Sequence, residues 1–301
     1  MKTSRVNAYA KLNLTLDIVG EKDGYHLLDS LVVTVNLSDR IVAKKRKDHL
    51  VSVRMHGMKS ESIPPEENNA LKAGEAFVAR FGTTGADITV YKNIPIGAGL
   101  GGSSADAAGV LNAMARLYEI SDGAALKELA DSLGSDTGYL LQGGLARMTG
   151  RGERVARLSC TPELWFLVLC PQDGVSTPQC YAAYDELGIV SSPRTERALS
   201  EIEKGNAEWA ALNFGNDLFE PAAQLNPAVK EALSALRHFS PSGAGMTGSG
   251  SACFAAFPTR ELCEWAKSRY RGKCRAYVLK SIDPKNKRGV KNIYSVEDEE
   301  E

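Results

Sequence analysis

A run of glycines between residues 97 and 102 is the strongest chemical signal in the 301-residue chain. Glycines let several backbone N–H groups converge on one anion, and a helix expected to start near Ser103 adds unpaired N–H donors and the positive end of its dipole. The hydroxyls of Ser103 and Ser104 could reach phosphate oxygens or Mg²⁺. From the residues alone, the run is consistent with a phosphate-binding loop and equally with a tight strand-to-helix packing turn. The loop comprises Pro95, Ile96, Gly97, Ala98, Gly99, Leu100, Gly101, Gly102, Ser103, Ser104 and Ala105.

Two familiar phosphate loops fit this segment poorly. A Walker A loop has Lys after its last Gly, where this chain has Ser103. Gly97, Gly99 and Gly102 do match the dinucleotide pattern GxGxxG, but a strand ending in an acidic residue should then follow the helix. The periodicity of 122–133 predicts a second helix instead. A nicotinamide-dependent oxidoreductase is therefore disfavoured.

Hydrophobic periodicity predicts the elements that must position this loop. Alternating leucines over 10–19, the turn pair Asp23-Gly24 and an apolar run over 27–35 predict a β-hairpin. Helical spacing over 69–81 and behind Ser103 predicts helices on either side of the loop. Further strands are predicted at 41–43, 50–55, 88–96, 139–158 (as a pair), 165–170, 251–257 and 274–280, and further helices from 177, over 227–237 and over 259–271.

Composition narrows the class of protein. With 36 Lys plus Arg against 37 Asp plus Glu, the net charge of -1 argues against a nucleic-acid binder that works by bulk charge. No apolar run is long enough for a transmembrane helix, and the first residues do not resemble a targeting leader. The six cysteines never form a CxxC pair, so we expect free thiols of a reducing cytoplasm and no zinc site.

Three motifs in the same order resemble the GHMP kinase superfamily. They are a Lys-bearing strand at 8–14, the glycine loop at 95–108 and a Gly/Ser loop at 243–251. Within the superfamily, the chain is most similar to the kinases that act on a cytidine diphosphate-linked alcohol of the non-mevalonate isoprenoid pathway. The segments that carry this closer resemblance are 10–14, 23–26, 134–136, 150–153 and 216–218.

The resemblance implies an α+β fold of two domains with the active site in the cleft between them. The N-terminal domain, residues 1–160, would be ribosomal-S5-like and carry the ATP loop. The C-terminal domain, residues 161–282, would be ferredoxin-like. The polar, acidic tail 283–301 is expected to be disordered.

The resemblance also implies a catalytic pair. Lys11 would lie beside the attacking hydroxyl and stabilise charge, and Asp136 would accept the hydroxyl proton. From the residues alone, Lys11 could equally face solvent on its strand and Asp136 could serve a turn. The chain departs from the family after Asp136, where Thr137-Gly138-Tyr139 replaces a hydrophobic residue followed by Pro.

Residues that bind the two substrates follow from the resemblance as well. Asn68 and Lys92 would line the adenine and ribose side of the ATP pocket. His26 would meet the edge of the cytosine and Tyr181 would stack on it. Each of these residues has a plainer alternative as a surface or core side chain. The substrate-binding residues implied by the resemblance are Asn13, Tyr25, His26, Thr177, Tyr181, Gly248 and Ser249.

Together these observations predict a cytoplasmic kinase that uses ATP and Mg²⁺ to phosphorylate the 2-hydroxyl of a cytidine diphosphate-linked small molecule, without nucleic-acid or membrane partners. One alternative is a GHMP kinase of homoserine, mevalonate or a sugar. Another is a non-catalytic GHMP-fold regulator, which we would expect to have lost Lys11 or Asp136. The metal ligands and the oligomeric state are left open.

Overall fold

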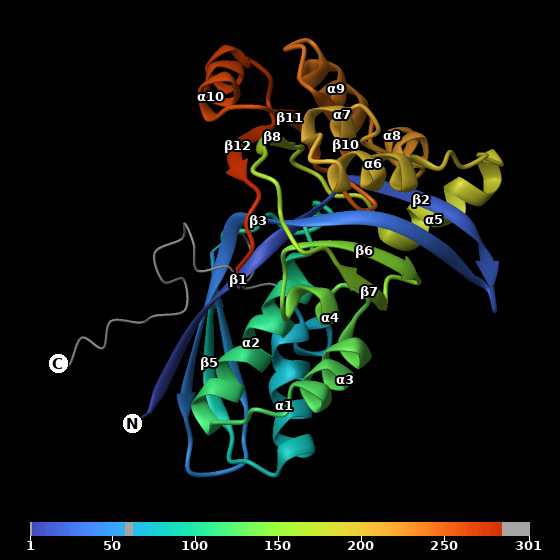
Figure 1. Ribbon diagram of the computed structural model, residues 1–301. Helices are drawn as coiled ribbons and strands as arrows, with labels where there is room; N and C mark the ends of the chain where they lie inside the picture. The colour runs from blue at the N-terminus through green and yellow to red at the C-terminus, as the bar shows by residue number, and fades with distance from the viewer. Residues whose placement is uncertain (1, 58–62, 285–301) are drawn as a thin grey trace.

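Two β-sheets organise the residues that the structure describes, 2–57 and 63–284, in a computed structural model (Figure 1). Helices α1 (Asn69–Phe81) and α2 (Gly102–Tyr118) pack on the larger, eight-stranded sheet. Helices α9 (Pro227–Arg237) and α10 (Arg260–Arg269) pack on the smaller, four-stranded sheet. The larger sheet contains β1 (Thr3–Asn13), β2 (Thr15–Lys22), β3 (Tyr25–Lys45), β4 (Ser52–His56), β5 (Ala86–Tyr91), β6 (Leu145–Gly150), β7 (Arg154–Arg157) and β9 (Gly215–Asn216). The smaller sheet contains β8 (Trp165–Cys170), β10 (Gly243–Met246), β11 (Cys253–Phe257) and β12 (Arg275–Lys280).

The helices occur singly or in runs between these strands along the chain. In the first half they are α1 (Asn69–Phe81), α2 (Gly102–Tyr118), α3 (Gly123–Leu133) and α4 (Thr137–Leu140). In the second half they are α5 (Thr177–Leu187), α6 (Arg194–Glu203), α7 (Ala207–Ala211), α8 (Phe219–Leu225), α9 (Pro227–Arg237) and α10 (Arg260–Arg269). No described helix has the length and the apolar composition that crossing a membrane would require.

The long strand β3 is the centre of the larger sheet. It pairs with β2 across the turn at Asp23-Gly24, as the hairpin prediction requires, and it also pairs with β1, β5 and β6. The strands predicted at 27–35 and 41–43 are therefore one continuous strand. The register between β1 and β3 shifts between Tyr9 and Lys11. Lys11 thus lies at an irregularity of its strand and is buried rather than facing solvent.

The strand predicted over 88–96 is shorter in the structure, because β5 ends at Tyr91. Asp39 causes the difference. Its Oδ1 accepts hydrogen bonds from the backbone N–H groups of Asn93, at 2.5 Å, and Ile94, at 2.9 Å. These bonds replace a strand ladder and turn the chain into the glycine loop. Ile94 then packs into the core without strand geometry, whereas Ile96 is exposed.

A buried ionic cluster joins the second half of the chain to the first sheet. Arg194, at the start of α6, contacts Asp17 on β2 at 3.1 Å and Asp217 at 2.5 Å. Asp17 also accepts a hydrogen bond from the backbone N–H of Thr195. The short strand β9 pairs in parallel with β2 beside this cluster. The sequence analysis predicted neither α6 nor β9. Helix α6 buries Thr195, Ala198 and Ile202 on one face, and β9 comprises only two residues.

The predicted domain boundary near 160 falls between β7 and β8 and stays a prediction. Asp283, which the tail prediction includes, forms an ion pair with Arg157 at 3.2 Å. Residues 285–301 lie outside the described residues.

All six cysteines are free thiols. Cys160 is exposed, Cys274 is half-buried, and the other four are buried. Burial raises the pKa of the Cys170 thiol to about 12, so this thiol stays protonated at neutral pH.

Candidate active site

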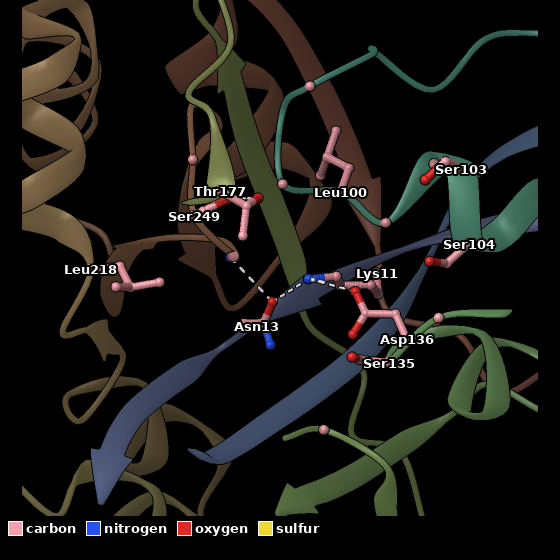
Figure 2. Close-up of a pocket in the computed structure, with 18 of the residues that line it drawn as sticks. Lys11, Asn13, Leu100, Ser103, Ser104, Ser135, Asp136, Thr177, Leu218 and Ser249 are labelled. Carbon is pink, nitrogen blue, oxygen red and sulfur yellow. Dashed lines mark hydrogen bonds and ion pairs between the residues drawn. The ribbon is translucent and has the colours of Figure 1, made fainter. Parts of the chain in front are cut away.

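A cavity of about 1120 Å³ lies between the glycine loop, the β2–β3 hairpin, the start of α4 and the start of α5. It brings together segments that are far apart in the sequence, as Figure 2 shows for its centre. Most of the predicted site residues line it. These are Lys11, Asn13, Tyr25, His26, Lys92, Thr177, Tyr181, Gly248, Ser249, Asp136 and the glycine loop from Pro95 to Ser104.

Lys11 and Asp136 meet at the centre of this cavity. The Lys11 Nζ atom lies 3.4 Å from Asp136 Oδ2, and it also donates a hydrogen bond to Asn13 Oδ1 (Figure 2). The Lys11 side chain is 4 % exposed, whereas that of Asp136 is 29 % exposed. A buried ammonium therefore holds a carboxylate that is open to the cavity. This arrangement can orient a hydroxyl and accept its proton.

The glycine loop is fixed against the Gly/Ser loop of the second half. Gly99 has a φ of +74°, and a Cβ atom there would lie 2.1 Å from the carbonyl oxygen of Thr247. The Ala252 N–H donates to the carbonyl of Ala98 at 3.1 Å, and the Lys11 N–H donates to that of Leu100 at 3.1 Å. Glycine is required where the two loops touch. These contacts hold the glycine loop against β1 at Lys11.

The N-terminus of α2 opens into the same cavity. Gly101 is its N-cap residue, with a φ of +73°, and supplies no side-chain cap. Ser103 and Ser104 follow in the first turn, and within the described part of the chain their hydroxyls have no hydrogen-bond partner. Uncapped N–H groups and free hydroxyls at a helix start can bind an anionic group such as a phosphate.

A buried cluster of three ionisable side chains lies under the loop. Lys92 Nζ contacts Asp106 Oδ2 at 2.6 Å and also pairs with Asp39. Burial by itself would lower the pKa of Lys92, but the two carboxylates outweigh it and raise the pKa. Burial raises the pKa of Asp106 to about 8; Lys92 opposes this shift, and Asp39 adds to it. The sequence analysis predicted neither Asp39 nor Asp106 as part of the site. The sequence hint for Asp106 was an acidic residue among the small residues of α2.

Aromatic side chains form the other end of the cavity. The rings of His26 and Tyr181 stack, with centroids 4.9 Å apart and planes 29° from parallel. His26 Nε2 lies 2.7 Å from Asp185 Oδ1, so α5 and the hairpin are joined. Burial raises the pKa of Tyr181, which keeps its phenol neutral. Tyr25 is 56 % exposed at the rim. These rings offer flat surfaces on which a base can stack.

Three polar contacts lie between the glycine-loop end and the aromatic end of the cavity. The Gly248 N–H donates to Asn13 Oδ1 at 3.1 Å, and Asn13 Nδ2 donates to Ser30 Oγ at 2.8 Å. The hydroxyls of Thr177 and Ser249 lie 2.7 Å apart. Asn216, to which the sequence assigned no chemistry, donates to the carbonyls of Met246 and Gly248 and so holds the Gly/Ser loop in place.

Two predicted site residues do not line the cavity. Asn68 caps α1, since its side chain accepts hydrogen bonds from the N–H groups of Ala70 and Leu71. Ala105 is buried in the first turn of α2.

The segment after Asp136 forms α4. Tyr139 in this helix is fully buried, and its hydroxyl donates a hydrogen bond to the Gly144 carbonyl at 2.6 Å. Among the described residues, no group of three or more His, Cys, Asp or Glu side chains could hold a metal ion.

The chain matches two family models. Residues 68–145 match the GHMP kinases N terminal domain, and residues 198–271 match the GHMP kinases C terminal model. The first match contains the glycine loop and Asp136. The second contains the Gly/Ser loop. The α+β fold of two GHMP domains is therefore confirmed.

Curated relatives share most of the chain. A 4-diphosphocytidyl-2-C-methyl-D-erythritol kinase of Caldicellulosiruptor bescii is 35% identical over 84% of this chain and 89% of its own length. A protein of the same name from Pelotomaculum thermopropionicum is 36% identical over 88% of this chain and 92% of its own length.

Solved structures agree in fold. The crystal structure of a 4-(cytidine 5'-diphospho)-2C-methyl-D-erythritol kinase superposes with a TM-score of 0.76 and 31% identity, covering 92% of this chain and 98% of that one. A homoserine kinase from Cytophaga hutchinsonii superposes with a TM-score of 0.70 at 15% identity, covering 94% of this chain and 95% of that one, which shows a shared fold alone.

Proposed function

The chain belongs to the GHMP kinases, in the family of the 4-diphosphocytidyl-2-C-methyl-D-erythritol kinases, and from this we propose how it acts. It transfers the γ-phosphoryl group of ATP to the 2-hydroxyl of 4-diphosphocytidyl-2-C-methyl-D-erythritol. ATP binds along the glycine loop and the start of α2. The acceptor lies between the aromatic end of the cavity and Asp136.

Asp136 and Lys11 carry out the chemistry in this proposal. The Asp136 carboxylate accepts the proton of the attacking hydroxyl as the oxygen approaches the γ-phosphorus. The Lys11 ammonium, 3.4 Å away, keeps that carboxylate in place and stabilises the charge that spreads over the transferred group. Asn13 fixes Lys11 through its own hydrogen bonds to Gly248 and Ser30. Catalysis then rests on positioning and charge, as phosphoryl transfer requires.

The donor set of the cavity fits a Mg²⁺ ion that is held mostly by phosphates. Mg²⁺ in such sites uses one or two carboxylates together with phosphate oxygens and water rather than an all-protein cage. The Asp136 carboxylate and the hydroxyls of Ser103 and Ser104 line the same cavity and are oxygen donors of this kind. When bound, the ion neutralises charge on the phosphates. The protein residues meanwhile orient the acceptor hydroxyl and exclude water from it.

The nucleotide side and the acceptor side are separate in this proposal. Lys92 lies toward the nucleotide, where its charge is balanced by Asp106 and Asp39. Tyr25, His26 and Tyr181 receive the cytidine at the opposite end. Thr177 and Ser249 face the acceptor between the two ends. A cytoplasmic location, which the sequence predicted, remains part of the proposal.

The single observation that supports this function most is the pairing of Lys11 with Asp136 inside the cavity that the glycine loop bounds. A coupled ADP-release assay with a panel of acceptors tests it. We expect activity with the cytidyl acceptor and little with homoserine, mevalonate or galactose. Preference for one of the other acceptors would favour a different GHMP kinase activity. Absence of ADP release with every acceptor would favour a non-catalytic regulator.

A further inference from the structure

We propose that Arg151 binds the diphosphate of the acceptor and thereby makes the protein select a nucleoside diphosphate over a nucleoside. This inference rests on the proposed function and adds a specificity residue to it. Arg151 lies in the turn between β6 and β7 and lines the cavity. Its side chain has no role in the chemistry described above.

The turn that carries Arg151 is built against the catalytic loop. Gly150 and Gly152 have φ values of +72° and +105°, so the turn depends on glycine on both sides of Arg151. Gly152 is buried, and a Cβ atom there would lie 3.4 Å from the Cβ of Ser135. Ser135 directly precedes Asp136 (Figure 2). One side of the turn is therefore fixed next to the reacting end of the cavity.

The Arg151 side chain reaches the opposite end. Its Cζ atom lies 4.6 Å from the centroid of the Tyr25 ring, in a cation–π contact. Arg151 thus spans the interval between the rim where the cytidine binds and the loop that holds Asp136. In the proposed acceptor, the diphosphate is the group that joins the cytidine to the alcohol. The guanidinium is placed where that group must lie.

The charges around the cavity lead to the same assignment. Three of its lining residues are Lys or Arg. Lys11 is paired with Asp136, and Lys92 is paired with Asp39 and Asp106. Within the described residues, Arg151 has no carboxylate partner. Its neighbour Glu153 instead accepts the Arg151 backbone N–H at 2.6 Å and contacts the Arg154 guanidinium at 3.7 Å.

The chemistry of the guanidinium suits the ligand. A planar guanidinium presents five N–H donors and can bind two phosphate oxygens at once, and it stays charged at every relevant pH. Its exposure at the cavity mouth lets it meet an incoming anion before the cavity is filled. A diphosphate without such a partner would bring its full charge into a cavity that also holds Asp136 and Asp185.

The test compares two ligands that differ only in the diphosphate. Dissociation constants of CDP and of cytidine are measured by calorimetry for the wild type, Arg151→Gln and Arg151→Lys, together with the KM for the cytidyl acceptor. We expect Arg151→Gln to weaken CDP and raise the KM about tenfold, with cytidine affinity, kcat and the KM for ATP nearly unchanged. Arg151→Lys, which keeps the charge, should restore part of the CDP affinity.

Arg154→Gln is the matched control. Arg154 is exposed on the same β-hairpin but does not line the cavity, so its loss removes the same charge without the proposed contact. Equal weakening of CDP in both variants would mean a general charge effect and would overturn the proposal. Equal weakening of CDP and cytidine in Arg151→Gln would mean that the side chain only supports Tyr25, and would also overturn it.

The two proposals fail differently. If the wild type releases no ADP with the cytidyl acceptor, the proposed function is wrong whatever Arg151 binds. If the wild type is active and Arg151→Gln keeps the wild-type ratio of CDP to cytidine affinity, the role of Arg151 is wrong and the function stands.

Discussion

Lys11 Nζ lies 3.4 Å from Asp136 Oδ2, and this contact joins the first strand of the sheet to the loop before α4. The lysine is buried and held by Asn13, whereas the aspartate is open to the cavity. A fixed cation beside an accessible carboxylate suits a group that must take a proton and then release it. The first predictions test this pair.

Asp136→Asn keeps the shape of the side chain but removes the proton acceptor. We expect kcat to fall roughly 10²–10⁴-fold, the range typical of a lost general base. ATP affinity, measured by calorimetry, should stay close to that of the wild type. Asp131→Asn is the control, because Asp131 lines the same cavity but pairs with Lys127 at 2.5 Å. A near-normal kcat for Asp136→Asn would remove this residue from the mechanism.

Lys11→Met should also lower kcat strongly, because it leaves Asp136 without its cation and the transition state without a positive charge. The double variant with Asp136→Asn is informative, since residues that act as a unit lose activity non-additively. We expect the double variant to be no slower than the worse single variant by more than about threefold. Fully multiplicative losses would mean that the two residues act independently.

Gly101→Val places a side chain where the loop approaches Lys11. The φ of +73° already disfavours valine, and the added Cβ would lie 3.0 Å from Lys11 Cγ. We expect ATP affinity to drop at least about tenfold while the fold persists. Gly123→Val serves as the control, since nothing lies within 4 Å of a Cβ at Gly123. Normal ATP binding by Gly101→Val would reduce the loop to a packing turn.

Tyr181→Ala removes the ring that stacks on His26 at 4.9 Å. Stacking on an aromatic contributes about 1–3 kcal/mol per base, so the KM for the cytidyl acceptor should rise roughly tenfold to a hundredfold. The KM for ATP should change little, because the proposal places ATP along the glycine loop. Trp209→Ala, which truncates an exposed aromatic of α7, should leave both constants unchanged. An unchanged acceptor KM in Tyr181→Ala would place the cytidine elsewhere.

The cluster of Lys92, Asp39 and Asp106 predicts a pH dependence of stability. Since burial raises the pKa of Asp106 from 3.8 to about 8, the folded protein binds a proton that the unfolded chain has released between these values. The free energy of unfolding should therefore fall as the pH rises through this window. Asp106→Asn should flatten the slope in denaturant titrations at pH 5, 6.5 and 8. An identical slope in the variant would contradict the assignment.

Local patterns of apolar residues predicted the elements whose stability comes from buried apolar side chains. The helix at 69–81 and the strand at 165–170 have the predicted bounds, and α2 begins one residue before Ser103. The predictions failed where a distant polar group decides the local structure. Asp39 ends β5 early, and the Arg194 cluster stabilises α6.

The candidate site shows the same division. The spacing of the glycines marked the loop as unusual, because its backbone geometry requires glycine, but its assignment to ATP came from the family resemblance. Lys11 and Asp136 carry no local signal of their own and came from the family resemblance. Asp39, Asp106 and Arg151 were missed because their roles depend on which charges the fold brings close to Lys92 and Tyr25, and no spacing in the sequence records those contacts.

The most direct measurement of the central claim is kcat/KM for ATP-dependent phosphorylation of 4-diphosphocytidyl-2-C-methyl-D-erythritol. It is compared with that for 2-C-methyl-D-erythritol 4-phosphate, which lacks the cytidine and one of the two phosphates. ADP release gives the rate, and phosphorus NMR of the product gives the position of the new phosphate. The account predicts at least a hundredfold preference for the cytidyl acceptor, in line with about 3 kcal/mol or more from the base and diphosphate, and a phosphate on the 2-hydroxyl. Equal kcat/KM for the two acceptors, or a phosphate at another position, would contradict it.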